Sequence, residues 1–175
     1  MTDFILVRHA TPDYSIIDKR HYVGFGNDLA PITDDGEKQT LILSKEKELQ
    51  DAQLIICSPY TRTMQTASIL SRELNLNIKV EIDLMEWIPD KTYLYNDYSK
   101  VVSWREHYDK NNGKNLYSDD NFEEKNEIIK RVKSVLEKYN NYKKVIVVTH
   151  GMVINALTGI SKPECAHFYK YSLNK

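Results

Sequence analysis

The chain has 175 residues and a formal net charge of −1 at pH 7. This length suits one domain with a sizeable core, so we expect residues 1–175 to form a single domain. The balanced charge gives no signal for nucleic acid or an anionic membrane surface as a partner. No segment approaches the roughly 18 apolar residues of a membrane span, and the N-terminal apolar run is too short for a signal peptide. We therefore expect a cytoplasmic protein.

The first predicted element is a strand over residues 4–8. Phe4-Ile5-Leu6-Val7 is an uninterrupted apolar run with β-branched members, which is typical of a strand buried on both faces of a parallel sheet. Arg8 and His9 follow the run directly, and Pro12 forces a turn soon after. Ligands of open α/β sheets bind outside the carboxyl ends of the strands, so Arg8 and His9 stand where a site is expected. Taken alone, this segment fits a surface arginine and a structural histidine equally well.

Residues 11–32 are predicted to form a long, functional or mobile loop, because glycine and proline interrupt every regular period. The basic cluster Lys19-Arg20-His21 within it fits a solvated surface better than a substrate contact. A helix is expected from the N-cap residue Thr33 to about Gln50. Its buried face is predicted to comprise Leu41, Ile42 and Leu49.

Residues 54–57 form the next predicted buried strand. Ser58-Pro59 ends this strand and opens a helix, with the proline at a tolerated first-turn position. Residues 78–82 alternate apolar and polar side chains and predict an outer strand. The buried face of the intervening helix is predicted to comprise Met64, Ala67, Ile69, Leu70 and Leu74.

Residues 84–120 are predicted to be a partly helical insertion, with a helix around residues 97–110, that lies over the strand ends as a cap. A small satellite core explains its many aromatic residues more readily than stacking on a substrate, and both interpretations stay open. These aromatic residues are Trp87, Tyr93, Tyr95, Tyr98, Trp104, Tyr108 and Tyr117.

The remaining pattern predicts a helix over residues 121–140, a strand over residues 144–148 and a short helix after Gly151, which permits a sharp turn. Residues 165–173 could supply a further strand. The alternation of strands and helices predicts an α/β fold. We expect three α/β/α layers around a mostly parallel sheet, with the insertion over the C-terminal ends of the strands.

A second strand-end histidine changes the interpretation of the first. The β-branched run of residues 145–148 ends in Thr149-His150-Gly151, so His9 and His150 become neighbours if their strands are adjacent. Arg62 lies in the first turn of the helix that follows residues 54–57 and can aim at the same pocket. Two guanidinium groups and two imidazoles at a helix N-terminus favour an anion, and phosphate is the natural candidate.

These residues occur within motifs that resemble the histidine phosphatase superfamily, which includes the phosphoglycerate mutase-like enzymes. The motifs follow the order and plausible spacing of that family over residues 4 to about 157. They are Leu6-Val7-Arg8-His9-Ala10, Pro31-Ile32-Thr33 with Gly36, Ser58-Pro59 through Arg62, Gln65-Thr66-Ala67, Leu84-Met85-Glu86 and Thr149-His150-Gly151.

The resemblance implies a phosphatase that hydrolyses a phosphomonoester through a phosphohistidine. His9 would be the nucleophile, and Arg8, Arg62 and His150 would clamp the phosphoryl oxygens. Glu86 would protonate the leaving oxygen and then deprotonate the attacking water. No metal and no cofactor are implied, because the arginines and the second histidine supply the positive charge.

The sequence departs from the family pattern in places. Pro12 and Ser15 stand where members often carry a hydroxyl and an asparagine that also contact phosphate. The Trp-Glu-Gly run that often follows the catalytic acid is missing after Glu86. Glu81 and Asp83 are therefore alternative candidates for the acid.

Three other functions stay open. A cysteine-based phosphatase would need a longer spacing than the four residues between Cys57 and Arg62. A mutase would return the phosphoryl group to its substrate, although the chain is short for that class. A non-catalytic module would bind a phospho-ligand or a protein. We expect a small phosphorylated substrate, with a phosphoprotein as the alternative, and the sequence does not predict an oligomeric state.

Overall fold

The computed structural model describes residues 2–173 of the chain. Its strands are β1 (Asp3–Arg8), β2 (Leu54–Cys57), β3 (Ile78–Val80), β4 (Lys144–Thr149) and β5 (Phe168–Tyr171). Its α-helices are α1 (Ser15–Lys19), α2 (Asp34–Leu43), α3 (Thr61–Leu74), α4 (Tyr98–Lys110), α5 (Lys125–Glu137) and α6 (Gly151–Thr158). Short 3-10 helices are η1 (Gly24–Leu29), η2 (Lys47–Leu49) and η3 (Ile82–Leu84).

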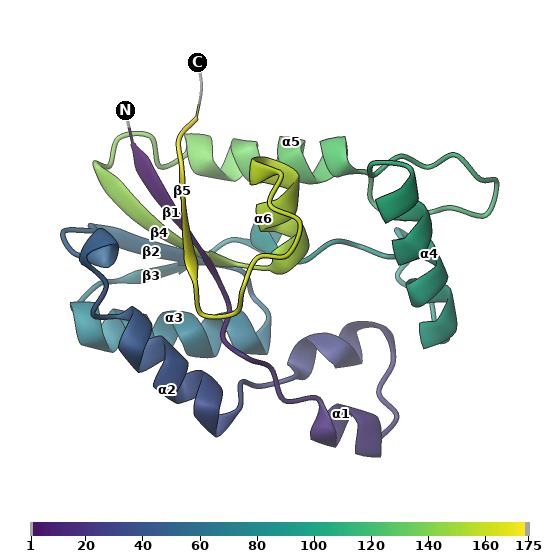
Figure 1. The fold of residues 1–175 in the computed structure, drawn as a ribbon, viewed down its shortest axis with the longest axis horizontal. Helices are drawn as coiled ribbons and strands as arrows, with labels where there is room; N and C mark the ends of the chain where they lie inside the picture. The colour runs from purple at the N-terminus through teal and green to yellow at the C-terminus, as the bar shows by residue number, and fades with distance from the viewer. Residues whose placement is uncertain (1, 174–175) are drawn as a thin grey trace.

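The strands form a single mixed sheet in the order β3-β2-β4-β1-β5 (Figure 1). Strands β3, β2, β4 and β1 are parallel, and β5 pairs antiparallel with β1 at the edge. The predicted α/β fold with a mostly parallel sheet is confirmed, and β5 lies within the residues suggested for a further strand. Arg8 of β1 pairs with Thr149 of β4, and a histidine follows each of them. The register therefore places His9 beside His150.

Helices cover both faces of the sheet, with α2 and α3 on one face and α5 and α6 on the other (Figure 1). Successive side chains of β1 point to opposite faces of the sheet, so this strand contributes to the core on each side. Phe4 and Leu6 belong to the core under α5 and α6, whereas Ile5 and Val7 belong to the core under α3. The cores hold the carboxyl ends of β1, β2 and β4 in fixed register, which is where the candidate site residues begin.

The predicted helix over residues 33–50 was too long. Helix α2 begins after the N-cap Thr33, as expected, but ends at Leu43. Its inward face consists of the buried residues Gly36, Thr40 and Leu43. Leu41 and Ile42 are 40% and 66% exposed, because the helical period turns them away from that face. Leu49 is buried as predicted, but from the separate turn η2.

Other boundaries also differ from the predictions. The loop over residues 11–32 contains α1 and η1, and its base is closed by an antiparallel bridge between Pro12 and Ile32. The outer strand ends at Val80, and Pro59 lies two residues before α3 rather than in its first turn. The helix expected over residues 121–140 spans only Lys125–Glu137, because a capping box between Glu124 and Glu127 fixes its start.

Most of the insertion's aromatic residues either extend the core or line a cavity, and Trp87 does both. Trp87 and Tyr108 pack with Phe122 at ring distances of 5.5–5.8 Å and extend the core, as the satellite-core interpretation expects. Tyr93, Tyr95 and Tyr98 instead line a cavity. Helices α1 and α4 lie beyond the carboxyl end of the parallel sheet (Figure 1). Within residues 2–173, no helix combines the length and the apolar character needed to span a membrane.

Candidate active site

His9 and His150 lie side by side at the ends of β1 and β4. The backbone N–H of His9 donates to the Thr149 carbonyl over 3.0 Å, which continues the ladder by one step. The two imidazole rings meet edge to face, with their centroids 5.2 Å apart. Their exposed fractions are 3% and 0%. The adjacency of two histidines that are distant in sequence is thus a direct product of strand order.

The imidazole of His9 is held in one tautomer. Its Nδ1 lies 2.8 Å from the Ala10 carbonyl oxygen, which can only accept a hydrogen bond, so Nδ1 carries the proton. The Nε2 lone pair is therefore free. Burial, together with the nearby Arg62 and Arg8 guanidinium groups, lowers the pKa of His9 to about 3. The ring is neutral at ordinary pH, which is the state that a nitrogen nucleophile requires.

Arg62 comes from the first turn of α3, as predicted, and is only 5% exposed. Its guanidinium carbon lies 5.1 Å from the ring centroid of Tyr60, and Nη2 is 3.7 Å from an Asp28 carboxylate oxygen. Among residues 2–173, its buried Nε and Nη1 atoms have no hydrogen-bond partner. A buried donor without a partner destabilises the protein, because it has given up water and gained no hydrogen bond. These two atoms therefore favour an anionic acceptor.

Arg8 is anchored by the segment that precedes β5. Its Nη1 donates to the Pro163 carbonyl over 2.6 Å, while its buried Nε has no partner within the described part of the chain. Gly151 lies next to this side chain, and a Cβ there would be in ordinary van der Waals contact with Arg8 Nε at 3.4 Å. The predicted sharp turn into a helix is present, since β4 ends at Thr149 and α6 begins at Gly151, although the φ of this glycine lies outside the left-handed region.

His150 completes a group of four basic side chains. Its Nε2 lies 2.8 Å from Ser58 Oγ, and its ring centroid is 5.0 Å from that of Tyr60. Burial lowers the pKa of His150 well below its ordinary value. Its Nδ1 is buried without a partner among residues 2–173. The structure therefore brings Arg8, His9, Arg62 and His150 together as a site suited to a tetrahedral oxyanion.

Glu86 faces the cavity next to this group. Its Oε1 accepts hydrogen bonds from the backbone N–H groups of Trp87 at 2.9 Å and Met152 at 3.2 Å. The alternative acids point elsewhere. Glu81 bonds to Lys138 and Tyr139 on the outer side of the fold, and Asp83 does not line the cavity. Of the three acids considered, the geometry favours Glu86.

Arg131 of α5 holds the segment that carries Glu86, and its part was missed in the sequence. Its guanidinium donates to the carbonyl oxygens of Asp83, Met85 and Glu86 at 2.6–3.2 Å. It also forms a two-pronged ion pair with the buried carboxylate of Glu123. An arginine on the polar face of an amphipathic helix carries no local signal for its contact with the Glu86 segment, since that contact is made to backbone carbonyl oxygens.

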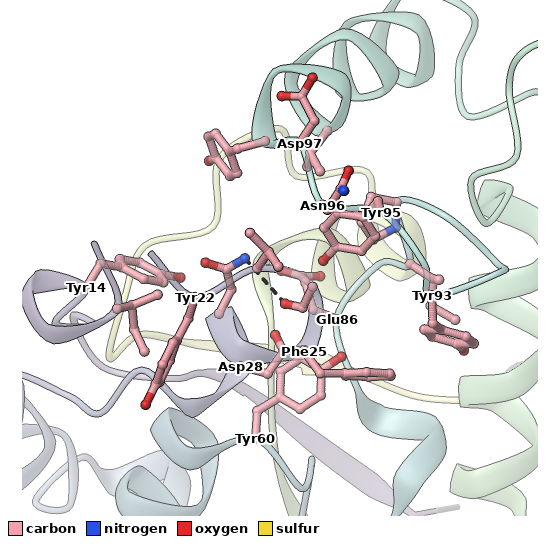
Figure 2. A pocket seen from close by; sticks show the side chains of 18 of the residues that line it. Tyr14, Tyr22, Phe25, Asp28, Tyr60, Glu86, Tyr93, Tyr95, Asn96 and Asp97 are labelled. Carbon is pink, nitrogen blue, oxygen red and sulfur yellow. Dashed lines mark hydrogen bonds between the residues drawn. The ribbon is translucent and has the colours of Figure 1, made fainter. Parts of the chain in front are cut away.

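Arg62 and Glu86 belong to the lining of a cavity of about 900 Å³. Figure 2 shows Glu86 among the other side chains of this lining. Tyr14 and Tyr22 line one side of this cavity, and Tyr93 and Tyr95 line the opposite side. Burial raises the pKa of Asp28, near Arg62, to about 6. Neither this cavity nor Asp28 was predicted, because the lining loops meet only in three dimensions.

Cys57 does not have the environment of a nucleophile. Its thiol is fully buried in the core, and burial raises its pKa to about 12. Reactive cysteines require a lowered pKa, so the geometry disfavours the cysteine-based alternative. Within residues 2–173, no three histidine, cysteine or carboxylate side chains are grouped to bind a metal ion.

Comparison with known proteins connects this geometry to a family. The family model of the histidine phosphatase superfamily (branch 1) matches residues 4–173. No curated protein sequence matches the chain.

Three solved structures have a similar fold. YhfR from Bacillus stearothermophilus is 21% identical with a TM-score of 0.66, and the alignment covers 91% of this chain and 79% of that chain. A putative alpha-ribazole-5'-P phosphatase from Escherichia coli is 20% identical, with a TM-score of 0.61 and coverages of 90% and 80%. A mycobacterial glucosyl-3-phosphoglycerate phosphatase is 17% identical, with a TM-score of 0.67 and coverages of 91% and 78%.

Proposed function

Since the chain belongs to the histidine phosphatase superfamily, we propose that it hydrolyses a small phosphomonoester through a phosphohistidine intermediate on His9. The observation that carries this proposal is the free Nε2 of a neutral His9 near donors of Arg8 and Arg62 that have no partner among residues 2–173. A nucleophile and a set of oxyanion donors in contact are what phosphoryl transfer requires.

In the first step, His9 Nε2 attacks phosphorus and the bond from phosphorus to the substrate oxygen breaks. Arg8, Arg62 and His150 stabilise the charge on the non-bridging oxygens. Glu86, in its protonated form, donates a proton to the departing alkoxide, so a neutral alcohol leaves. The proposal needs no metal, because the clamp itself supplies the positive charge.

In the second step, a water molecule attacks the phosphoryl group. The Glu86 carboxylate removes a proton from that water, and the bond between phosphorus and nitrogen breaks. Inorganic phosphate and neutral His9 are released, and Glu86 regains its proton for the next cycle. The two solved structures named above as phosphatases support hydrolysis of a small ester over phosphoryl return to the substrate.

Phosphate release and phosphoenzyme trapping test this proposal together. We expect wild type to release phosphate from benzyl phosphate in the presence of a metal chelator. An alkaline quench during turnover with a labelled ester should trap an alkali-stable, acid-labile phosphoenzyme. His9→Ala should lose both signals, whereas His167→Ala, which removes an exposed histidine, should keep them.

The alternatives give different results. Activity that survives in His9→Ala but not in Cys57→Ser would restore the cysteine mechanism. Labelled phosphoryl groups that return to a phosphoglycerate instead of water would assign a mutase. Tight binding of vanadate without release of phosphate from any ester would leave a binding module.

A further inference from the structure

The walls of the cavity carry aromatic side chains that the core does not use. Tyr14, Tyr22 and Phe25 come from residues 11–32, and Tyr93 and Tyr98 come from the insertion. Their exposed fractions lie between 38% and 68%, which is high for such large apolar rings. Phe25 stacks on Tyr93 with ring centroids 5.0 Å apart, so the two loops meet across this contact.

The phenol groups of Tyr14 and Tyr95 on these walls are uncharged. Burial raises the pKa of Tyr95 to about 12 and also raises that of Tyr14. Their hydroxyl groups can therefore donate hydrogen bonds, and their rings present negative faces to the cavity. Such faces suit a flat ring by stacking or a cation by cation–π attraction.

The charged groups of the same walls are mostly acidic. Asp18, Asp28 and Asp97 line the cavity together with Glu86. The basic groups that line it are His21 and Arg62, and Arg62 belongs to the phosphate site. Arg20 donates to the Tyr22 hydroxyl over 3.1 Å and has its guanidinium carbon 6.0 Å from the Tyr22 ring centroid, but it is not part of the lining. Once a phosphate neutralises Arg62, the remaining field repels a second anion.

We propose, resting on the proposed function, that the cavity selects small phosphomonoesters whose alcohol carries a flat ring and a positive charge or no charge. Esters that carry a carboxylate or a second phosphate on the alcohol are disfavoured. The volume of about 900 Å³ lies in the range of small-molecule sites. Asp18 and Asp97 supply the charge selection, and the tyrosines supply the ring selection.

A matched series of esters tests the charge selection. Benzyl phosphate, 4-(aminomethyl)benzyl phosphate and 4-(carboxymethyl)benzyl phosphate differ in charge, while the reacting oxygen is equally insulated in each. At low ionic strength we expect the amine ester to have a kcat/KM about tenfold or more above that of the carboxylate ester. Benzyl phosphate should also exceed n-butyl phosphate. Equal values, or preference for the carboxylate ester, overturn the inference and leave the proposed function intact.

A pair of charge-removing variants locates the selection. Asp18 makes no side-chain hydrogen bond with residues 2–173, and Asp97 caps α4 through Ser99 N, a role that asparagine can keep. The double variant Asp18→Asn/Asp97→Asn should reduce the preference for the amine ester at least about threefold. Glu106→Gln removes a charge from α4 outside the cavity lining and should leave the preference unchanged. An unchanged preference in the double variant overturns the assignment.

A binding measurement separates failure of this inference from failure of the proposed function. If no ester releases phosphate, the proposed function fails, but the cavity can still be tested with the parent alcohols. With saturating inorganic phosphate in the anion site, 4-(hydroxymethyl)benzylamine should bind more tightly than 4-(hydroxymethyl)phenylacetate in an NMR titration. The reverse order overturns the inference. A lysine-flanked phosphotyrosine peptide that is turned over faster than every small ester would overturn the small-molecule assignment.

Discussion

The phosphate end and the open end of the site are built in opposite ways. His9 and His150 stand at the ends of central strands and are almost fully buried, with exposed fractions of 3% and 0%. The cavity walls come from residues 11–32 and from the insertion, and Phe25 and Tyr98 there are 53% and 68% exposed. The sheet therefore fixes the groups that we propose to react, while two loops form the walls of the cavity beside them. A change at the first end should remove the chemistry, and a change at the second should redirect it.

The largest expected effect is at the phosphate end. Arg62→Ala should lower kcat/KM about a hundred- to a thousandfold, since a buried cation that faces the transferred group is lost. Arg72→Ala removes an exposed arginine from the last turn of the same helix and should leave turnover unchanged. Steady-state kinetics with benzyl phosphate give the comparison. A similar loss in both variants would contradict the placement of Arg62 in the anion site.

A large effect on stability is expected where the two ends join. Arg131→Leu leaves the Glu123 carboxylate, which is 5% exposed, without its partner, so unfolding free energy should fall by about 3 kcal/mol or more. The Arg105–Asp109 pair is 43% and 58% exposed, and Arg105→Leu should change stability by less than about 1 kcal/mol. Urea unfolding measures both. Equal losses would show that Arg131 does not clamp the segment that carries Glu86.

A smaller effect is expected from the acid at the boundary. Glu86→Gln should lower kcat about tenfold or more with an alkyl ester, because the leaving alkoxide is no longer protonated. Binding of vanadate should persist. Glu81→Gln and Asp83→Asn serve as controls, since neither residue lines the cavity. A loss confined to one of these two controls would move the role of the acid to that residue.

The smallest effect is expected at the open end, in the pH dependence of stability. Burial raises the pKa of Asp28 to about 6 from 3.8, so the folded protein binds this proton more tightly than the unfolded chain. Ionised Asp28 therefore destabilises the fold above pH 6, and that penalty disappears as the pH falls toward 4. Compared with wild type, Asp28→Asn should raise the free energy of unfolding by about 1 kcal/mol at pH 7.5 and leave it unchanged at pH 4. A gain independent of pH would contradict this environment.

The same division decides what the sequence predicts. Uninterrupted apolar runs such as Leu54–Cys57 mark the buried strands in the sequence. Arg8, His9, Arg62 and His150 come at or just after the ends of such runs, so the sequence predicts that they lie together. Parallel strand ends meet at one edge, so local pattern and topology suffice there.

The open end was not predictable in this way. The stack of Phe25 on Tyr93 joins residues from separate segments, and neither segment has a periodic pattern. The prediction for Leu41 and Ile42 was wrong for a different reason. Both are apolar and were predicted to be buried, but they lie at the surface of α2. Arg131 was missed because it holds the segment of Glu86 through backbone carbonyls, which no sequence pattern marks.

The anchoring of Arg8 by Pro163 has a consequence for how the protein is made. β1 is synthesised before its parallel neighbour β4, and the carbonyl that orients Arg8 also comes later, from Pro163. Contacts between segments so distant in the chain form late and slow the folding reaction. A nascent chain that already displays His9 has no complete anion site until this later segment leaves the ribosome. Recovery of phosphate binding during refolding would therefore report the pairing of β1 with β4 and the docking of the Pro163 segment rather than an early collapse.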